Sequence, residues 1–143
     1  MLTTHSVATA VLEQEEWDFS AVYYTAIDHF CHAFMQYAEP QQPHIADSDF
    51  EIFKDVITAC YRFSDMTLGR LLDFCDEETS VVLCSDHGFH SGSRRLRDTP
   101  REPAGPAAWH REFGIFVAAG PNIRQSDTLC GASLIDLLSL IHI

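Results

Sequence analysis

The sequence predicts an α/β fold in which a mainly parallel sheet is flanked by helices. Three segments have the composition of strands, namely the β-rich run 18–27, the apolar run 80–85 and the run 114–119. Between the first two, apolar residues recur with a period of about 3.6 residues from Asp49 for about six turns, which is typical of a long amphipathic helix. Strands that alternate with helices favour a parallel sheet, and short apolar runs are typical of strands buried on both of its faces.

The remaining segments complete this alternation. A helix is predicted over about residues 6–16, and another over residues 133–143. Ser48 or Asp49 can cap the start of the long helix. The stretch 88–108 is rich in Gly, Ser, Arg and Pro, which predicts a long surface loop.

The composition is that of an ordinary globular protein with one domain. Of its 143 residues, 46% are hydrophobic and 21% are charged. Twenty-one acidic residues against nine basic ones give a formal charge of −12. This charge argues against a nucleic-acid backbone or an anionic membrane surface as the main partner and favours divalent cations. Solubility alone is an alternative explanation of the acidic balance.

The spacing of the cysteines and the lengths of the apolar segments indicate the cellular compartment. The five cysteines form no CxxC pair and have no regular spacing, so neither a disulfide framework nor a zinc finger is indicated, and a reducing, cytoplasmic compartment is expected. No stretch approaches the roughly 18 uninterrupted apolar residues of a membrane span. The N-terminus lacks the layout of a signal peptide. If the chain is a fragment, an upstream signal would be invisible in it.

Polar side chains follow the first predicted strand, at the edge where the functional groups of an α/β sheet gather. Asp28 and His32 are four residues apart, so a helix opening here would place them on one face. A carboxylate and an imidazole placed in this way can share one divalent ion. The alternative is a capping aspartate beside a partly buried histidine, which is also how His29 and His44 are interpreted.

A second polar cluster ends the apolar run 80–85. Asp86 and His87 follow this run directly, where a charged group is costly without a partner, and Gly88 permits the sharp turn that exposes both side chains. His110 precedes the third predicted strand and, taken alone, is equally compatible with a surface histidine. Trp109, beside it, is predicted to be a core residue or to anchor the loop.

Taken in order, three motifs resemble those of the type I phosphodiesterase and nucleotide pyrophosphatase family of the alkaline phosphatase superfamily. They are Asp-x-x-x-His at 28–32, Ser-Asp-His-Gly at 85–88 and His-x-x-x-Gly-x-Phe at 110–116. The likeness extends to segments 61–72 and 116–121 and so covers nearly the whole chain. It implies a partial alkaline-phosphatase-like core, in which residues 1–143 form a single domain that is the C-terminal portion of a larger catalytic domain.

The resemblance also implies a two-metal site, because enzymes of this family hold two ions, commonly zinc. Asp28, His32 and His110 would ligate one ion, while Asp86 and His87 would contribute to the other. Two divalent ions can stabilise the charge that phosphoryl transfer builds on the attacking, leaving and equatorial oxygens. Zn²⁺ is the expected metal, with Mn²⁺ as the alternative.

The family's nucleophile is a Thr or Ser, and no residue of this sequence matches its position. The nucleophile and one further carboxylate are therefore expected upstream of Met1, and the isolated chain is expected to be inactive. Ser85 precedes the Asp86–His87 pair and is predicted to be a strand-end hydrogen-bonding residue. Residues 136–142 also depart from the Asp-x-x-Pro-Thr-x-Leu pattern with which family members often continue.

The predicted function is hydrolysis of phosphodiester, pyrophosphate or phosphomonoester bonds in a nucleotide or other small-molecule substrate, without a nucleic-acid or membrane partner. One alternative is a non-catalytic metal-binding fragment or pseudoenzyme, and another is a sulfatase or phosphoglycerate-mutase-like enzyme of the same superfamily. The arginines of the predicted loop would either contact a substrate phosphate or lie solvated in a mobile loop. They are Arg94, Arg95, Arg97 and Arg101.

Overall fold

The computed structural model describes residues 2–99 and 105–141, which group into two compact units. Unit 1 comprises Met1–Cys75 and Phe89–Arg111, and unit 2 comprises Asp76–Gly88 and Glu112–Ile143. Each unit has its own internal packing. The prediction of one domain over residues 1–143 stays a prediction.

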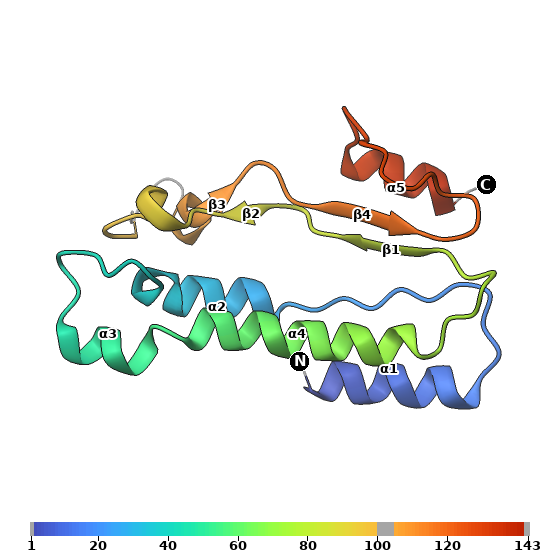
Figure 1. Ribbon diagram of the computed structural model, residues 1–143, viewed down its shortest axis with the longest axis horizontal. Coiled ribbons are helices and arrows are strands. Elements are labelled where there is room, and N and C mark those ends of the chain that lie inside the picture. The colour runs from blue at the N-terminus through green and yellow to red at the C-terminus, as the bar shows by residue number, and fades with distance from the viewer. Residues whose placement is uncertain (1, 100–104, 142–143) are drawn as a thin grey trace. The chain divides into compact units, whose positions relative to one another are not determined.

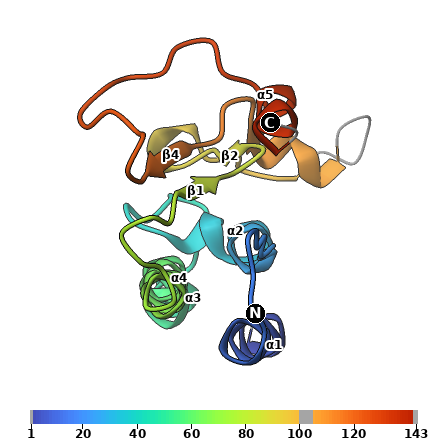
Figure 2. The same cartoon turned by 90° about the vertical axis from the view of Figure 1, so that its right-hand side faces the viewer.

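Unit 1 is mainly helical, and the axes of its α-helices are nearly parallel, with the chain running through α2 in the direction opposite to α4 (Figures 1 and 2). Helix α2 packs along α4, and the short 3-10 helix η1 continues α2. The elements of its first segment are α1 (Leu2–Gln14), α2 (Ala26–Phe34), η1 (Met35–Tyr37), α3 (Asp47–Phe53) and α4 (Val56–Leu72). The predicted helix at 6–16 therefore corresponds to α1.

The long amphipathic helix predicted from Asp49 is two helices, because the chain turns between α3 and α4 at residues 54 and 55. The apolar period continues through this turn, so periodicity alone did not reveal the break. The predicted cap is wrong. Helix α3 begins after Ala46, whose side chain has no polar group to cap it, and both Ser48 and Asp49 lie inside the helix.

The strand predicted at residues 18–27 is also wrong. Residues 16–25 have neither helical nor strand structure, and α2 already begins at Ala26. Phe19 and Tyr23, which carry much of the β-propensity of this run, are 63% and 77% exposed. β-propensity reflects how well side chains pack on a sheet. No described strand pairs with this segment, so its β-propensity does not produce a strand.

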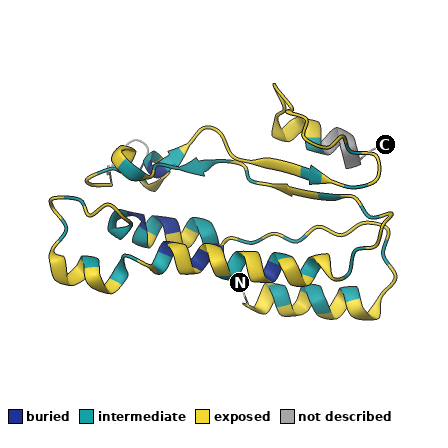
Figure 3. Ribbon diagram, in the orientation of Figure 1, coloured by how far each residue is buried: buried dark blue, intermediate teal, exposed yellow. Residues whose placement is uncertain are grey.

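The core of unit 1 lies between α2, α4 and the residue before β3 (Figure 3). Its buried side chains are Cys31, Met35, Ile57 and Trp109, with Ile27, Phe34, Ala38, Phe89 and Leu96 packed against them. Burial raises the pKa of Cys31 to about 11, so its thiol is protonated and acts as a small apolar side chain. Trp109 is confirmed as a core residue.

The stretch 88–108, predicted as a loop, contains short regular elements. Strand β2 (Gly88–Phe89) pairs with β3 (His110–Arg111) in a two-stranded sheet. Between these strands lie the 3-10 helices η2 (Gly92–Arg94) and η3 (Gly105–Trp109). The connection therefore leaves the core at β2 and returns to it at β3.

Unit 2 contains an antiparallel pair of strands and a helix. Strand β1 (Val81–Cys84) pairs with β4 (Phe116–Ala119), with Val81 opposite Ala119 and Cys84 opposite Phe116. Helix α5 (Leu134–Ile141) follows, in agreement with the helix predicted from residue 133. No helix in the described part of the chain is long and apolar enough to cross a membrane.

The mainly parallel sheet that the sequence predicted is not found among the described strands. Both apolar runs are strands, but they pair antiparallel, and Val82, Leu83 and Val117 are exposed rather than buried on both faces. A run of four apolar residues is compatible with a parallel or an antiparallel partner, because the direction of pairing depends on the chain trace and not on the run itself.

Ser85 extends the β1–β4 pairing by one residue and is confirmed as a strand-end hydrogen-bonding residue. Its N–H donates to the Ile115 carbonyl (3.0 Å), and the Ile115 N–H donates to the Ser85 hydroxyl oxygen (2.9 Å). Gly114 makes this approach possible, because a Cβ atom at this position would lie 2.1 Å from the Ser85 carbonyl oxygen. The strand end that precedes Asp86 thus depends on a glycine that is distant in the sequence.

Gly114→Ala is expected to separate Ser85 from Ile115 and to destabilise unit 2 by about 1–3 kcal/mol, the usual cost of inserting a group where no space exists. Amide hydrogen exchange at Ser85 measures the effect directly. The control is Gly69→Ala in α4, where a Cβ atom meets nothing within 4 Å and the helix should gain roughly 0.5–1 kcal/mol. Unchanged protection of Ser85 in Gly114→Ala would contradict the close approach.

Candidate metal centre

Asp28 and His32 lie on successive turns of α2, as their spacing predicted. The helix is short and strongly amphipathic, with Ala26 and Cys31 buried and the Asp28–His32 face half-exposed. Asp28 Oδ1 lies 3.4 Å from His32 Nε2. The helix therefore brings a carboxylate and an imidazole to one point without help from any other element.

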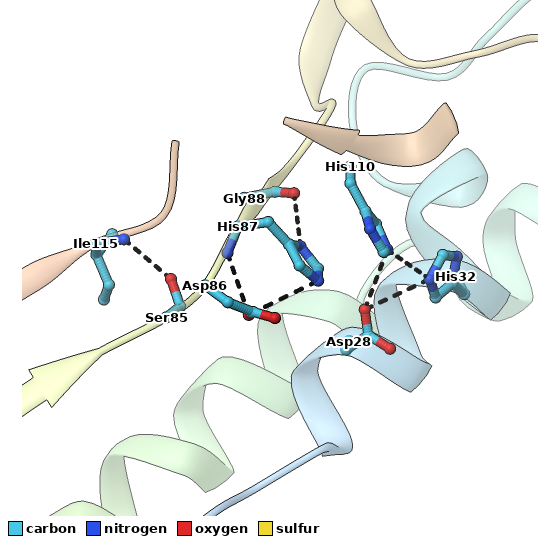
Figure 4. A network of polar contacts seen from close by, with 8 residues as sticks. All are labelled: Asp28, His32, Ser85, Asp86, His87, Gly88, His110 and Ile115. Atoms are coloured by element: carbon cyan, nitrogen blue, oxygen red, sulfur yellow. Dashed lines mark hydrogen bonds and ion pairs between the residues drawn. The ribbon is translucent and has the colours of Figure 1, made fainter. Parts of the chain in front are cut away.

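His110 reaches the same point from β3 (Figure 4). Its Nε2 lies 3.4 Å from Asp28 Oδ1 and 2.9 Å from His32 Nε2. The neighbouring Trp109 anchors this strand, because its ring is buried in the core and its Nε1–H donates to the Thr99 hydroxyl oxygen at 2.8 Å. Core packing thus fixes the position of His110 although 78 residues separate it from His32.

The three donor atoms have the spacing of ligands around one small cation. In a tetrahedral zinc site with bonds of about 2.0–2.2 Å, neighbouring ligand atoms lie roughly 3.3–3.6 Å apart. Asp28 Oδ1 is at 3.4 Å from each imidazole nitrogen, and the two nitrogens are at 2.9 Å, so only the nitrogen pair would have to separate slightly. Two imidazoles and one carboxylate are also a donor set that suits zinc.

The two nitrogens constrain the protonation of the site. At 2.9 Å, His32 Nε2 and His110 Nε2 attract each other only if one of them carries the proton. If both carried lone pairs they would repel each other, and a divalent cation bound to both would turn this repulsion into attraction. The carboxylate of Asp28, at 3.4 Å from both, adds the negative charge that such a cation needs.

Phe89 packs against both imidazoles and was not identified from the sequence. Its ring makes edge-on contacts with His32 (centroids 4.8 Å apart) and with His110 (5.1 Å). An apolar ring in this position limits the rotation of both histidines and lowers the local polarity. The sequence offered one weak signal, which is the position of Phe89 immediately after the Asp-His-Gly motif.

Asp86 and His87 belong to unit 2, after the end of β1 (Figure 4). Asp86 Oδ1 accepts a hydrogen bond from the His87 backbone N–H (3.1 Å) and lies 3.8 Å from His87 Nε2. His87 Nδ1 lies 3.2 Å from the Gly88 carbonyl oxygen, which can only accept, so Nδ1 carries the proton in the neutral ring. The lone pair is then on Nε2, the arrangement usual for a histidine that binds metal.

The other polar residues singled out in the sequence lie elsewhere. His29 and His44 are exposed, which corrects their interpretation as partly buried histidines. Arg94 and Arg97 are exposed, and Arg101 lies outside the described residues. Arg95 is buried, so it neither contacts a substrate phosphate nor lies solvated in a loop, and both predictions are wrong for this residue. The composition of the segment gave no signal that distinguished Arg95 from its neighbours.

The comparisons with known proteins confirm the family that the motifs resemble. A family model described as type I phosphodiesterase / nucleotide pyrophosphatase matches residues 2–111 of the 143-residue chain. The matched range contains every residue discussed above as a candidate ligand. No curated protein sequence and no solved structure matches the chain.

Proposed function

Because the chain belongs to the type I phosphodiesterase and nucleotide pyrophosphatase family, we propose that it is the metal-binding part of a hydrolase that cleaves phosphodiester or pyrophosphate bonds. The family itself implies hydrolase activity. One observation supports the metal dependence. Three potential ligand atoms lie within 3.4 Å of one another, namely Asp28 Oδ1, His32 Nε2 and His110 Nε2.

In this proposal Asp28, His32 and His110 hold one divalent ion. Three protein ligands leave a fourth tetrahedral position for water, a hydroxyl nucleophile or a phosphate oxygen. A bound ion would polarise a phosphate oxygen and lower the pKa of a coordinated hydroxyl group. The protein's own contribution is to hold the three donors together, with Phe89 packed against both imidazoles.

Asp86 and His87 are proposed as ligands of a second ion. The hydrogen bond between His87 Nδ1 and the Gly88 carbonyl supports this role, since it directs the lone pair to Nε2. Asp86 is exposed and supplies a carboxylate beside it. Zn²⁺ is the proposed metal at both positions, with Mn²⁺ as the alternative, and the substrate is a small phosphate ester or a nucleotide.

The hydroxyl nucleophile used by enzymes of this family is proposed to come from outside the segment that carries the five candidate ligands. Ser85 is the hydroxyl residue adjoining the Asp86–His87 pair, and its Oγ accepts the hydrogen bond of the Ile115 N–H. A hydroxyl group engaged in this way supports a strand-end role. The 143-residue chain is therefore proposed to bind metal and phosphate groups without turnover.

The test is calorimetric titration of the chain, first with Zn²⁺ and then with AMP, a nucleotide product of pyrophosphate cleavage. We expect Zn²⁺ to bind, AMP to bind only to the zinc-loaded chain, and bis(4-nitrophenyl) phosphate to be hydrolysed no faster than by free Zn²⁺. Zinc binding without AMP binding would favour the non-catalytic alternative. A chain that binds no zinc would remove the basis of the proposal.

A further inference from the structure

Arg95 lies in the connection between β2 and β3 and is buried, with 7% of its surface exposed. Its guanidinium is surrounded by backbone carbonyl groups rather than by acidic side chains. Nε donates to the carbonyl of Gly92 (2.9 Å), and Nη1 donates to those of Met35 (3.3 Å), Gln36 (3.2 Å) and Ala38. Nη2 donates to the carbonyl of Pro40.

Four of these carbonyl groups belong to one short segment, residues 35–40, at the carboxyl-terminal end of α2 and η1. Carbonyl groups at such an end carry partial negative charge, which favours a cation there. A buried charge is tolerated when it is hydrogen-bonded, and the planar guanidinium presents five N–H donors in a fixed fork. A lysine, with one compact charge, cannot reach so many acceptors at once.

The contacts of Arg95 join the end of the helix that carries two of the proposed ligands to the connection that leads to the third. Asp28 and His32 lie on α2, and Arg95 donates hydrogen bonds to carbonyl groups at the end of this helix and of η1. His110 begins β3, where the connection that contains Arg95 ends. Leu96, the next residue, packs against the buried cluster by apolar contact alone.

We propose that Arg95 is a positioning residue of the metal centre. By fixing the β2–β3 connection to the end of α2 and η1, it acts together with the core packing of Trp109 to hold His110 at its distance from the Asp28–His32 pair. The inference rests on the proposed function, because it presumes that these three residues bind one ion. A purely structural role predicts instead that loss of Arg95 lowers stability and leaves the coordination of the ion unchanged.

The experiment titrates the 143-residue chain with Co²⁺, whose visible absorption bands depend on coordination geometry. The variants are Arg95→Lys and the matched control Arg94→Lys, which changes an exposed neighbour. Arg95→Lys is expected to weaken Co²⁺ affinity by at least about tenfold, the lower range for residues that support a ligand, and to alter the absorption bands. Arg94→Lys should leave both unchanged.

Two further variants separate positioning from stability. Leu96→Ala should destabilise the same connection while it leaves the contacts of Arg95 in place, and it is expected to retain the wild-type Co²⁺ bands. Arg95→Gln, which keeps two N–H donors without the charge, is the second variant if Arg95→Lys does not fold. Circular dichroism at the titration temperature confirms that each variant is folded.

The outcomes distinguish this inference from the proposed function. If a folded Arg95→Lys variant had the same Co²⁺ absorption bands as the wild type, the proposed role of Arg95 would be wrong, and the proposed function would be unaffected. If Leu96→Ala altered the bands as much as Arg95→Lys, the effect would follow stability, and the role of Arg95 would again be wrong. A wild-type chain that binds no Co²⁺ would overturn both.

Discussion

His32→Ala is expected to abolish zinc binding at the first site. His32 Nε2 is one of three donor atoms that lie within 3.4 Å of one another, and two remaining donors do not make a zinc site. The expected loss of affinity exceeds about 100-fold, the upper range for residues that merely support a ligand. Thermal melting measures it, because zinc at 100 times the wild-type dissociation constant should stabilise the wild type by about 2.7 kcal/mol and the variant by less than about 0.4 kcal/mol.

His29→Ala is the matched control for this change. It removes the same side chain from the same helix, but His29 is exposed and is not among the three converging residues. Its zinc affinity and its melting in the presence of zinc should equal those of the wild type. If His32→Ala retained the zinc-dependent stabilisation, or if His29→Ala lost it, the assignment of the site to Asp28, His32 and His110 would be wrong.

Trp109→Ala is expected to have the largest effect on stability. Trp109 is 4% exposed and packs with Cys31, Met35 and Ile57 in the core of unit 1. Truncation of a buried tryptophan leaves a cavity and typically costs about 3–5 kcal/mol. Urea denaturation followed by circular dichroism should show this loss as a lower midpoint. Zinc affinity should fall with it, because Trp109 anchors the strand that carries His110.

Trp17→Ala serves as the control for removal of a tryptophan. Trp17 is partly exposed and is outside the buried cluster, so its loss should cost clearly less. Trp109→Phe should recover most of the packing while it removes the hydrogen bond to Thr99. Equal midpoints for Trp17→Ala and Trp109→Ala would show that the cluster is not the main source of stability in unit 1.

The local part of the candidate site could be predicted from the sequence. The spacing of Asp28 and His32 fixes their relation within any helix, and the helix exists. Ser85 was identified at a strand end because the apolar run stops there, and its contacts with Ile115 confirm this. These predictions succeeded because each was read from a local pattern, the i,i+4 spacing in one case and the end of an apolar run in the other. Metal binding by the five candidate ligands stays a prediction.

The features that depend on distant residues could not be predicted. The apolar runs identified β1 and β4 but not their antiparallel pairing, because such runs report composition and not the direction of the partner strand. Nothing local distinguishes Arg95 from Arg94, yet only the first is buried against carbonyl groups more than fifty residues away. Phe89 likewise became part of the site through its contacts with both imidazoles.

The burial of Cys31 has a consequence for which ions the site can accept. Cys31 precedes His32 directly, but consecutive helical side chains point about 100° apart, and the thiol lies in the core with its pKa raised to about 11. A thiolate beside the imidazoles would attract soft cations such as Cu⁺. Because the helix keeps this sulfur protonated and buried, the donors left at the surface are nitrogen and oxygen, so an ion bound at the proposed site would be a borderline or hard divalent metal.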